Sequence, residues 1–141
     1  MKHLVVIVWA LAVAGCGNSA ATNKETLTES IRSYNDGIRW GRFDAAAVLR
    51  PARERSQFAD DMDKRAKDVK ITDYDIIRVD EKGDRLAKVQ IKMSWYNDLE
   101  GTLHETHSMQ TWERHGKAWL MVEEARYRGA EMPGLADKLK D

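Results

Sequence analysis

The sequence has a single cysteine, Cys16, among 141 residues, and its 23 basic residues are matched by 23 acidic ones. A lone thiol has no partner for an intramolecular disulfide, and it argues against the multi-cysteine ligand sets of structural zinc sites. The balanced charge gives no basis for a nucleic-acid interface. Walker, dinucleotide-binding, Ser-His-Asp and helical HExxH motifs are also missing. We therefore expect no cofactor, no metal and no nucleic-acid partner.

The cysteine stands at the end of an apolar segment near the start of the chain. Lys2 supplies a positive charge, and residues 4–14 are apolar and uncharged. This segment is too short to span a bilayer, which needs about 20 apolar residues, but it has the length of the apolar part of a secretory signal. Residues 13–16, Val-Ala-Gly-Cys, resemble the lipobox of bacterial lipoproteins. That resemblance implies cleavage before Cys16 and acylation of this residue.

These observations predict a membrane anchor. We expect a lipoprotein signal peptide over residues 1–15, and a lipidated cysteine with a flexible tether over residues 16–24. Two or more acyl chains hold a protein stably at a membrane, whereas one holds it only reversibly. Gly17, rather than an aspartate, follows the cysteine, which favours the outer membrane and a periplasm-facing domain in the bacterial envelope. The alternative is an ordinary signal peptide in which Cys16 has no role.

The first half of the remaining chain is predicted to be helical. Residues 25–40 carry apolar side chains every three or four positions, which indicates an amphipathic helix. Gly41 interrupts this pattern, and Asp44 is a suitable N-cap for a short helix over residues 44–49. A third, heavily charged helix is expected over residues 51–67, with Pro51 in its first turn.

After residue 69 the apolar pattern changes to the period of a strand. Residues 87–95 alternate Ala, Val, Ile, Met and Trp with polar side chains, as in a strand with one buried face. Further strands are expected over residues 69–79, 103–114 and 118–124, with connections that contain Gly83, Gly101 and Gly116. Helices followed by a four-stranded antiparallel meander predict an α+β fold.

Two segments resemble the NTF2-like superfamily, which includes cystatin-like and SnoaL-type proteins. They are residues 34–49, "YNDGIRWGRFDAAAVL", and residues 111–124, "TWERHGKAWLMVEE". The resemblance implies N-terminal helices packed on a curved four-stranded antiparallel sheet, the NTF2-like cone. It assigns residues 25–125 to the domain and residues 126–141 to a C-terminal extension. It also implies a homodimer formed through the sheet.

Tyr34 is the candidate catalytic residue that the resemblance suggests. It stands seven positions before Gly41, as does the oxyanion-donating tyrosine of ketosteroid isomerases in this superfamily. A neutral donor in an apolar cavity stabilises negative charge as it develops. The mechanism also needs a carboxylate that faces the same cavity, and the motifs identify none. The alternative is a core tyrosine whose hydroxyl is hydrogen-bonded.

Aromatic residues on the predicted strands are candidates for a ligand pocket. They are Trp95, Trp112 and Trp119, and together with Tyr34 they would form the walls of a pocket for an apolar ligand. The alternative is that the tryptophans fill the core. His104 and His107 do not predict a metal site, because residues three apart on a strand point to opposite faces.

From these features we predict a lipid-anchored envelope protein that binds a small apolar ligand, or another envelope protein, without catalysis. The alternative is an isomerase-like or cyclase-like enzyme that uses Tyr34 as its oxyanion donor.

Overall fold

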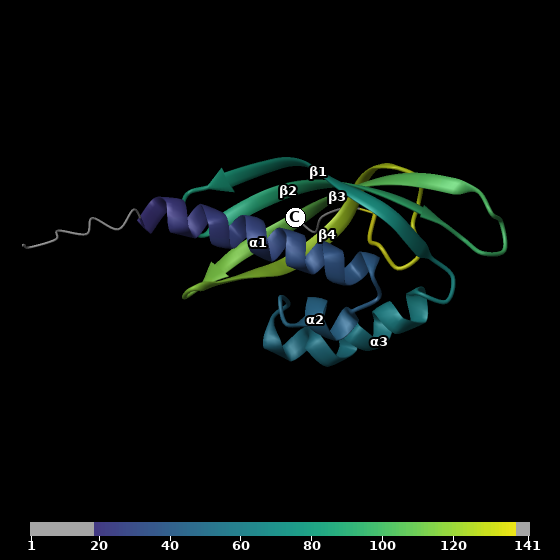
Figure 1. The fold of residues 1–141 in the computed structure, drawn as a ribbon, viewed down its shortest axis with the longest axis horizontal. Coiled ribbons are helices and arrows are strands. Elements are labelled where there is room, and N and C mark those ends of the chain that lie inside the picture. Colours follow the sequence, from purple (N-terminus) through teal and green to yellow (C-terminus); the bar gives the residue numbers. More distant parts are fainter. Residues whose placement is uncertain (1–18, 138–141) are drawn as a thin grey trace, which may run out of the picture.

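The computed structural model describes residues 19–137, and it places three helices before four strands (Figure 1). The predicted lipidation site, Cys16, lies outside the described residues. The helical elements are α1 (Ser19–Arg39), α2 (Phe43–Ala47), a 3₁₀ turn η1 (Ala52–Glu54) and α3 (Arg55–Arg65). The strands are β1 (Lys70–Lys82), β2 (Leu86–Tyr96), β3 (Leu103–His115) and β4 (Ala118–Gly129). Helix α1 begins before the predicted start at residue 25, inside the segment assigned to a tether.

The four strands form one antiparallel sheet in the order β1-β2-β3-β4, so each strand pairs with the strand before it. The predicted α+β fold is therefore confirmed. Strand β2 shows the clearest alternation, because every second side chain from Ala87 to Trp95 is buried and those between are partly exposed. This pattern divides the sheet into an inner face, which the helices cover, and an outer face.

Helix α1 lies along the inner face, with α2 and α3 beside its C-terminal half (Figure 1). Its apolar positions are buried against the sheet, because a spacing of three or four residues puts them on one side of the helix. The core that results joins Leu27, Ile31 and Tyr34 of α1 with Val89 and Ile91 of β2.

A close approach between α1 and α2 fixes the angle at which the chain turns back. A Cβ atom at Gly37 would lie 3.0 Å from the Cβ of Ala46, so a side chain at this position would push α2 away by a few tenths of an ångström. Gly41 then takes a positive φ of 68°, which ends α1 and lets the chain reverse. The glycine break that the sequence predicted is therefore present.

Strand β4 carries a bulge that changes which side chains point inward. Its partners along β3 shift between Thr111, which faces Glu123, and Trp112, which faces Met121. Val122 is the extra residue, so the alternation is offset by one position from there on. As a result Glu124 pairs with Gln110 on the inner face, two strand positions beyond Met121.

The chain after β4 packs back onto the sheet. Ala136 forms a parallel bridge with Ala125, and the Arg126 amide donates to the Ala136 carbonyl at 2.7 Å. Met132 is buried, and the Arg126 guanidinium donates to the Asp137 carboxylate at 2.9 Å. The segment over residues 130–137, which we call the C-terminal strap, is thus part of the domain surface.

Candidate functional site

A cavity of about 400 Å³ lies between α1, α3, the inner face of the sheet and the C-terminal strap. Its apolar wall consists mainly of three methionines, two aromatic rings and two aliphatic side chains: Met62, Met93, Met121, Tyr34, Phe58, Ile38 and Leu135. Charged residues also line it, namely Arg50, Arg53, Arg65, Glu54, Asp61 and Glu124. Three arginines and three acids leave this lining without a net charge.

Tyr34 lines this cavity and packs between two aromatic rings. Its ring lies between Phe58, at a centroid distance of 6.0 Å, and Trp112, whose ring meets it edge-on at 5.8 Å. The side chain is 2 % exposed, and its hydroxyl makes no hydrogen bond to another described residue. Burial is the main cause that raises the pKa of Tyr34, and the nearby Glu124 carboxylate raises it further. The hydroxyl is therefore held neutral and able to donate.

Glu124 supplies a carboxylate to the same cavity, and a chain of polar side chains orients it. The Ser108 hydroxyl donates to Oε1 at 2.7 Å, and the Gln110 amide donates to the same oxygen at 3.2 Å. Gln110 in turn exchanges hydrogen bonds with Asn35 of α1 and accepts one from the Trp112 indole at 3.1 Å. Both donors reach Oε1, so Oε2 keeps its capacity to accept.

Two arginines approach the cavity from the helical side. Arg50 donates from Nη2 to Glu54 at 2.8 Å and from Nη1 to the Met121 sulfur at 3.2 Å, while its Nε is buried without a partner. The side chain of Arg65, in the last turn of α3, makes no ion pair or hydrogen bond with any residue in the range 19–137. Burial lowers the pKa of Arg65, and the negative charge of Glu124 opposes this shift.

A glycine of the strap keeps the Arg65 side chain in place. A Cβ atom at Gly134 would lie 2.8 Å from Cδ of Arg65, and the φ of +79° at Gly134 itself favours glycine. The strap therefore packs against the aliphatic part of Arg65, and Leu135 closes the adjoining part of the cavity wall.

This arrangement can bind a small molecule through apolar contacts and a few directed hydrogen bonds. Methionine side chains adapt their shape to a ligand at low cost, and three of them line the cavity. The polar groups with unused capacity include Arg65, Glu124, the Tyr34 hydroxyl and the buried Nε of Arg50. A donor, an acceptor and a neutral hydroxyl around one apolar chamber are typical of ligand sites.

The structure brings only one of the four sequence-predicted pocket residues to the cavity lining, namely Tyr34. Trp112 is fully buried behind the Tyr34 ring. Trp95 is buried and donates from its indole to the Thr106 hydroxyl at 2.8 Å, and Trp119 is 4 % exposed in the core. The three tryptophans therefore pack in the interior beside or away from the cavity.

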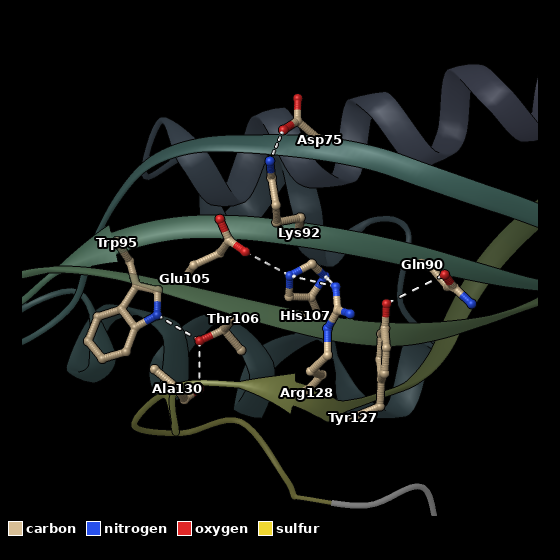
Figure 2. A network of polar contacts seen from close by, with 10 residues as sticks. All are labelled: Asp75, Gln90, Lys92, Trp95, Glu105, Thr106, His107, Tyr127, Arg128 and Ala130. Atoms are coloured by element: carbon tan, nitrogen blue, oxygen red, sulfur yellow. Dashed lines mark hydrogen bonds and ion pairs between the residues drawn. The ribbon is translucent and has the colours of Figure 1, made fainter.

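The outer face of the sheet carries a separate polar cluster, shown in Figure 2. His107 lies 2.8 Å from the Glu105 carboxylate and within 3.4 Å of the Arg128 guanidinium, while Lys92 pairs with Asp75 at 2.9 Å. His104 stacks on Trp95 instead, at a centroid distance of 4.6 Å. No group of three or more metal-ligating His, Cys, Asp or Glu side chains occurs within residues 19–137.

Sequence reasoning missed Glu124 and Arg65. A regular strand would place Glu123 inward after Trp119 and Met121, and only the bulge at Val122 turns Glu124 to the inner face. Arg65 was one of several basic residues on a charged helix, and its burial depends on the strap, which lies far away in sequence. The available signal for Glu124 was the pair of glutamates, Glu123 and Glu124, at the end of an apolar strand, since one of the two must point to the inner face.

No protein-family model matches the sequence, and no curated protein sequence matches it either. In structure, the chain is similar to a SEC-C motif containing protein from Rhodopseudomonas palustris, solved in solution. The TM-score is 0.61 at 15 % sequence identity, and the match covers 70 % of this chain and 77 % of that protein. At this identity the likeness shows the fold alone.

These findings correct the identification of the chain as a member of the NTF2-like superfamily, which is wrong. The lipid anchor at Cys16 stays a prediction. The solved structure reported above is of a protein described by a different motif, and no family model, NTF2-like or other, matches the sequence. The residues that suggested the family, 34–49 and 111–124, form a helix with a glycine break and a hairpin, which are common local structures. The homodimer through the sheet stays a prediction. No helix within residues 19–137 is long and apolar enough to cross a membrane.

Proposed function

We propose that this domain binds a small, mainly apolar molecule in the cavity around Tyr34 without converting it. The single observation that carries this proposal is the cavity itself, with an adaptable apolar wall and several polar groups that have unused hydrogen-bonding capacity. Core polar groups are normally paired, so groups left open around a chamber indicate a binding role. A partner protein is less well supported, because the polar groups face inward.

The experiment compares two tryptophan substitutions in the strap. Leu135 lines the cavity, so Leu135→Trp fills part of it, whereas Ala136 is exposed and Ala136→Trp adds the same volume outside. We expect native mass spectrometry of the full chain, purified from its own cells, to detect a bound small molecule. That molecule should be lost in Leu135→Trp and kept in Ala136→Trp. A chain with no bound molecule, or equal retention in both variants, contradicts the proposal.

We also propose that the domain is held at a bacterial envelope membrane through lipid on Cys16. Residues 13–16 support this part of the proposal independently of any fold assignment, because they combine a small-residue cleavage site with the only thiol of the chain. We expect Cys16→Ser to leave an unprocessed or soluble product after cell fractionation. Normal membrane association of this variant would contradict the anchor.

A second candidate function is proton-transfer catalysis with Tyr34 as the donor to a developing oxyanion. The specific observation in its favour is that the carboxylate of Glu124 lines the same cavity and influences the Tyr34 hydroxyl. The two functions separate in Tyr34→Phe, with the molecule that co-purifies as the test compound. A binding domain keeps the compound unchanged, whereas an enzyme converts it and loses that conversion in the variant.

A further inference from the structure

Two opposite charges in the cavity remain without an ion-pair partner among the described residues. Arg65 makes no ion pair among the described residues, although the negative charge of Glu124 acts on it. Oε1 of Glu124 accepts from Ser108 and Gln110, and Oε2 accepts from no described residue. The two groups therefore line the same cavity and interact electrostatically. Their charged nitrogen and oxygen atoms stay farther apart than the 4.0 Å of an ion pair.

The other arginine of the inner wall is already neutralised. Arg50 forms its ion pair with Glu54 at 2.8 Å and lies with its guanidinium 5.3 Å from the centroid of the Phe58 ring. Arg53 is 86 % exposed, so water satisfies its charge. This leaves Arg65 and Glu124 as the pair whose charges a ligand can compensate.

A partly buried charge is costly unless a partner or a set of hydrogen bonds compensates it. An anionic ligand would satisfy Arg65 and be repelled by Glu124, and a cationic ligand would do the reverse. A molecule with both charges satisfies both groups at once. Hydrogen bonds between ionised groups are also stronger than neutral ones, so such a ligand gains the most from this site.

Resting on the proposed binding function, we propose that the ligand is a small zwitterion: a free α-amino acid with an apolar side chain. Its carboxylate lies against the Arg65 guanidinium and the Tyr34 hydroxyl, and its ammonium group lies against Oε2 of Glu124. Its side chain packs among the methionines and the Phe58 ring. The cavity volume of about 400 Å³ is at the small end of the range for ligand pockets, which suits a single amino acid.

The arrangement of the site accounts for each part of such a ligand. The neutral Tyr34 hydroxyl donates to the carboxylate without adding charge, so the balance between Arg65 and Glu124 is kept. The methionine wall accepts side chains of different shape, and selectivity then depends on the charged head group more than on the body of the ligand.

The test uses four compounds that share a phenyl group and differ in charge. L-Phenylalanine carries both charges, 3-phenylpropionate only the negative one, 2-phenylethylamine only the positive one, and 3-phenylpropanol neither. With the full chain in isothermal titration calorimetry, we expect L-phenylalanine to bind most tightly. Each compound with one charge should bind about 10- to 100-fold more weakly, because one charge-assisted contact is lost.

Two variants assign each charge to its residue. Arg65→Met should weaken binding of L-phenylalanine and 3-phenylpropionate and tighten binding of 2-phenylethylamine, whose ammonium group it no longer repels. Glu124→Gln should weaken binding of L-phenylalanine and 2-phenylethylamine and tighten binding of 3-phenylpropionate, whose carboxylate it no longer repels. Arg78→Met, which removes an exposed arginine of β1 that does not line the cavity, is the matched control and should leave all affinities unchanged. Circular dichroism checks that each variant is folded, and the four compounds decide the question on the unaltered chain alone.

Other outcomes overturn the inference, and they separate it from the proposed function. If 3-phenylpropanol binds as tightly as L-phenylalanine, the cavity is a ligand site and the zwitterion is wrong. A second outcome is that no standard amino acid raises the thermal unfolding temperature of the chain, while a different molecule co-purifies and is lost in Leu135→Trp. In that case the assignment of a zwitterionic ligand is wrong and the proposed binding function stands. If nothing binds and nothing co-purifies, both are wrong.

Discussion

An arginine, a glutamate and aromatic rings lie beside each face of the sheet, and the two sets differ in how their charges are paired. On the outer face, His107 lies between Glu105 at 2.8 Å and Arg128 at 3.3 Å, and the Tyr127 ring meets it at 5.9 Å (Figure 2). On the inner face, Arg65 and Glu124 stay apart around Tyr34. A cluster that satisfies its own groups stabilises the sheet, whereas one that leaves them open has capacity for a ligand.

The largest difference between the faces should appear when their aromatic residues are removed. Trp112→Ala deletes a fully buried indole that packs on Tyr34 and donates to Gln110, so we expect a loss of about 3–5 kcal/mol in the free energy of unfolding. Tyr127→Ala removes a ring that is 45 % exposed and should cost less than about 1 kcal/mol. Urea unfolding followed by circular dichroism measures both, and similar losses would remove the distinction between the faces.

The next difference concerns alkaline pH. Because burial and Glu124 raise the pKa of Tyr34 above its ordinary value of 10.0, the folded chain keeps a proton that the unfolded chain loses above that pH. Unfolding then releases a proton, and stability falls by about 1.4 kcal/mol for each pH unit above 10. Burial and a hydrogen bond to Asp36 raise the pKa of Tyr74 to about 12. Tyr74 therefore adds to the loss of stability between pH 10 and pH 12.

Tyr34→Phe should therefore make the loss of stability above pH 10 less steep. At neutral pH it should change the free energy of unfolding by less than about 1 kcal/mol, because the hydroxyl has no hydrogen bond to lose. Tyr127→Phe on the outer face is the control. Urea unfolding at a series of pH values gives the slope, and an unchanged slope in Tyr34→Phe would contradict the assignment of this proton to the cavity.

The smallest expected effect is that replacing Arg65 and replacing Arg128 change the free energy of unfolding in opposite directions. Arg65→Met replaces a half-buried guanidinium that lacks a contact partner, so we expect the free energy of unfolding to rise by up to about 1 kcal/mol. Arg128→Met removes a contact to His107 on the outer face and should lower it by up to about 1 kcal/mol. Thermal unfolding of both variants tests this. Destabilisation by Arg65→Met would show that the charge of Arg65 stabilises the fold, which would contradict the view that it lacks a partner there.

Periodicity predicted the regular parts of this fold because local geometry determines them. Residues 87–95 alternate in the sequence and alternate in burial in β2, and the apolar positions of α1 face the core as a helix of period 3.6 requires. The strand boundaries were displaced by only a few residues, except that β4 continues to Gly129 rather than residue 124.

The site depended on features that have no local signal. The bulge at Val122 reverses the alternation that placed Glu123 inward, so Glu124 was not a candidate. Arg65 becomes part of the cavity only because the strap brings Gly134 against it. Tyr34 was identified as central through a family resemblance that the comparisons contradict, and its role now rests on its burial and its neighbours.

The order of strands in the sheet has a consequence for how the protein is made. Because β1, β2, β3 and β4 pair in the order of synthesis, each hairpin can close as soon as its second strand leaves the ribosome. The cavity cannot be completed in this stepwise way, since Tyr34 comes from the first helix and Leu135 from the end of the described chain. The lining of the cavity is therefore complete only after Leu135 has been translated, later than all four strands of the sheet.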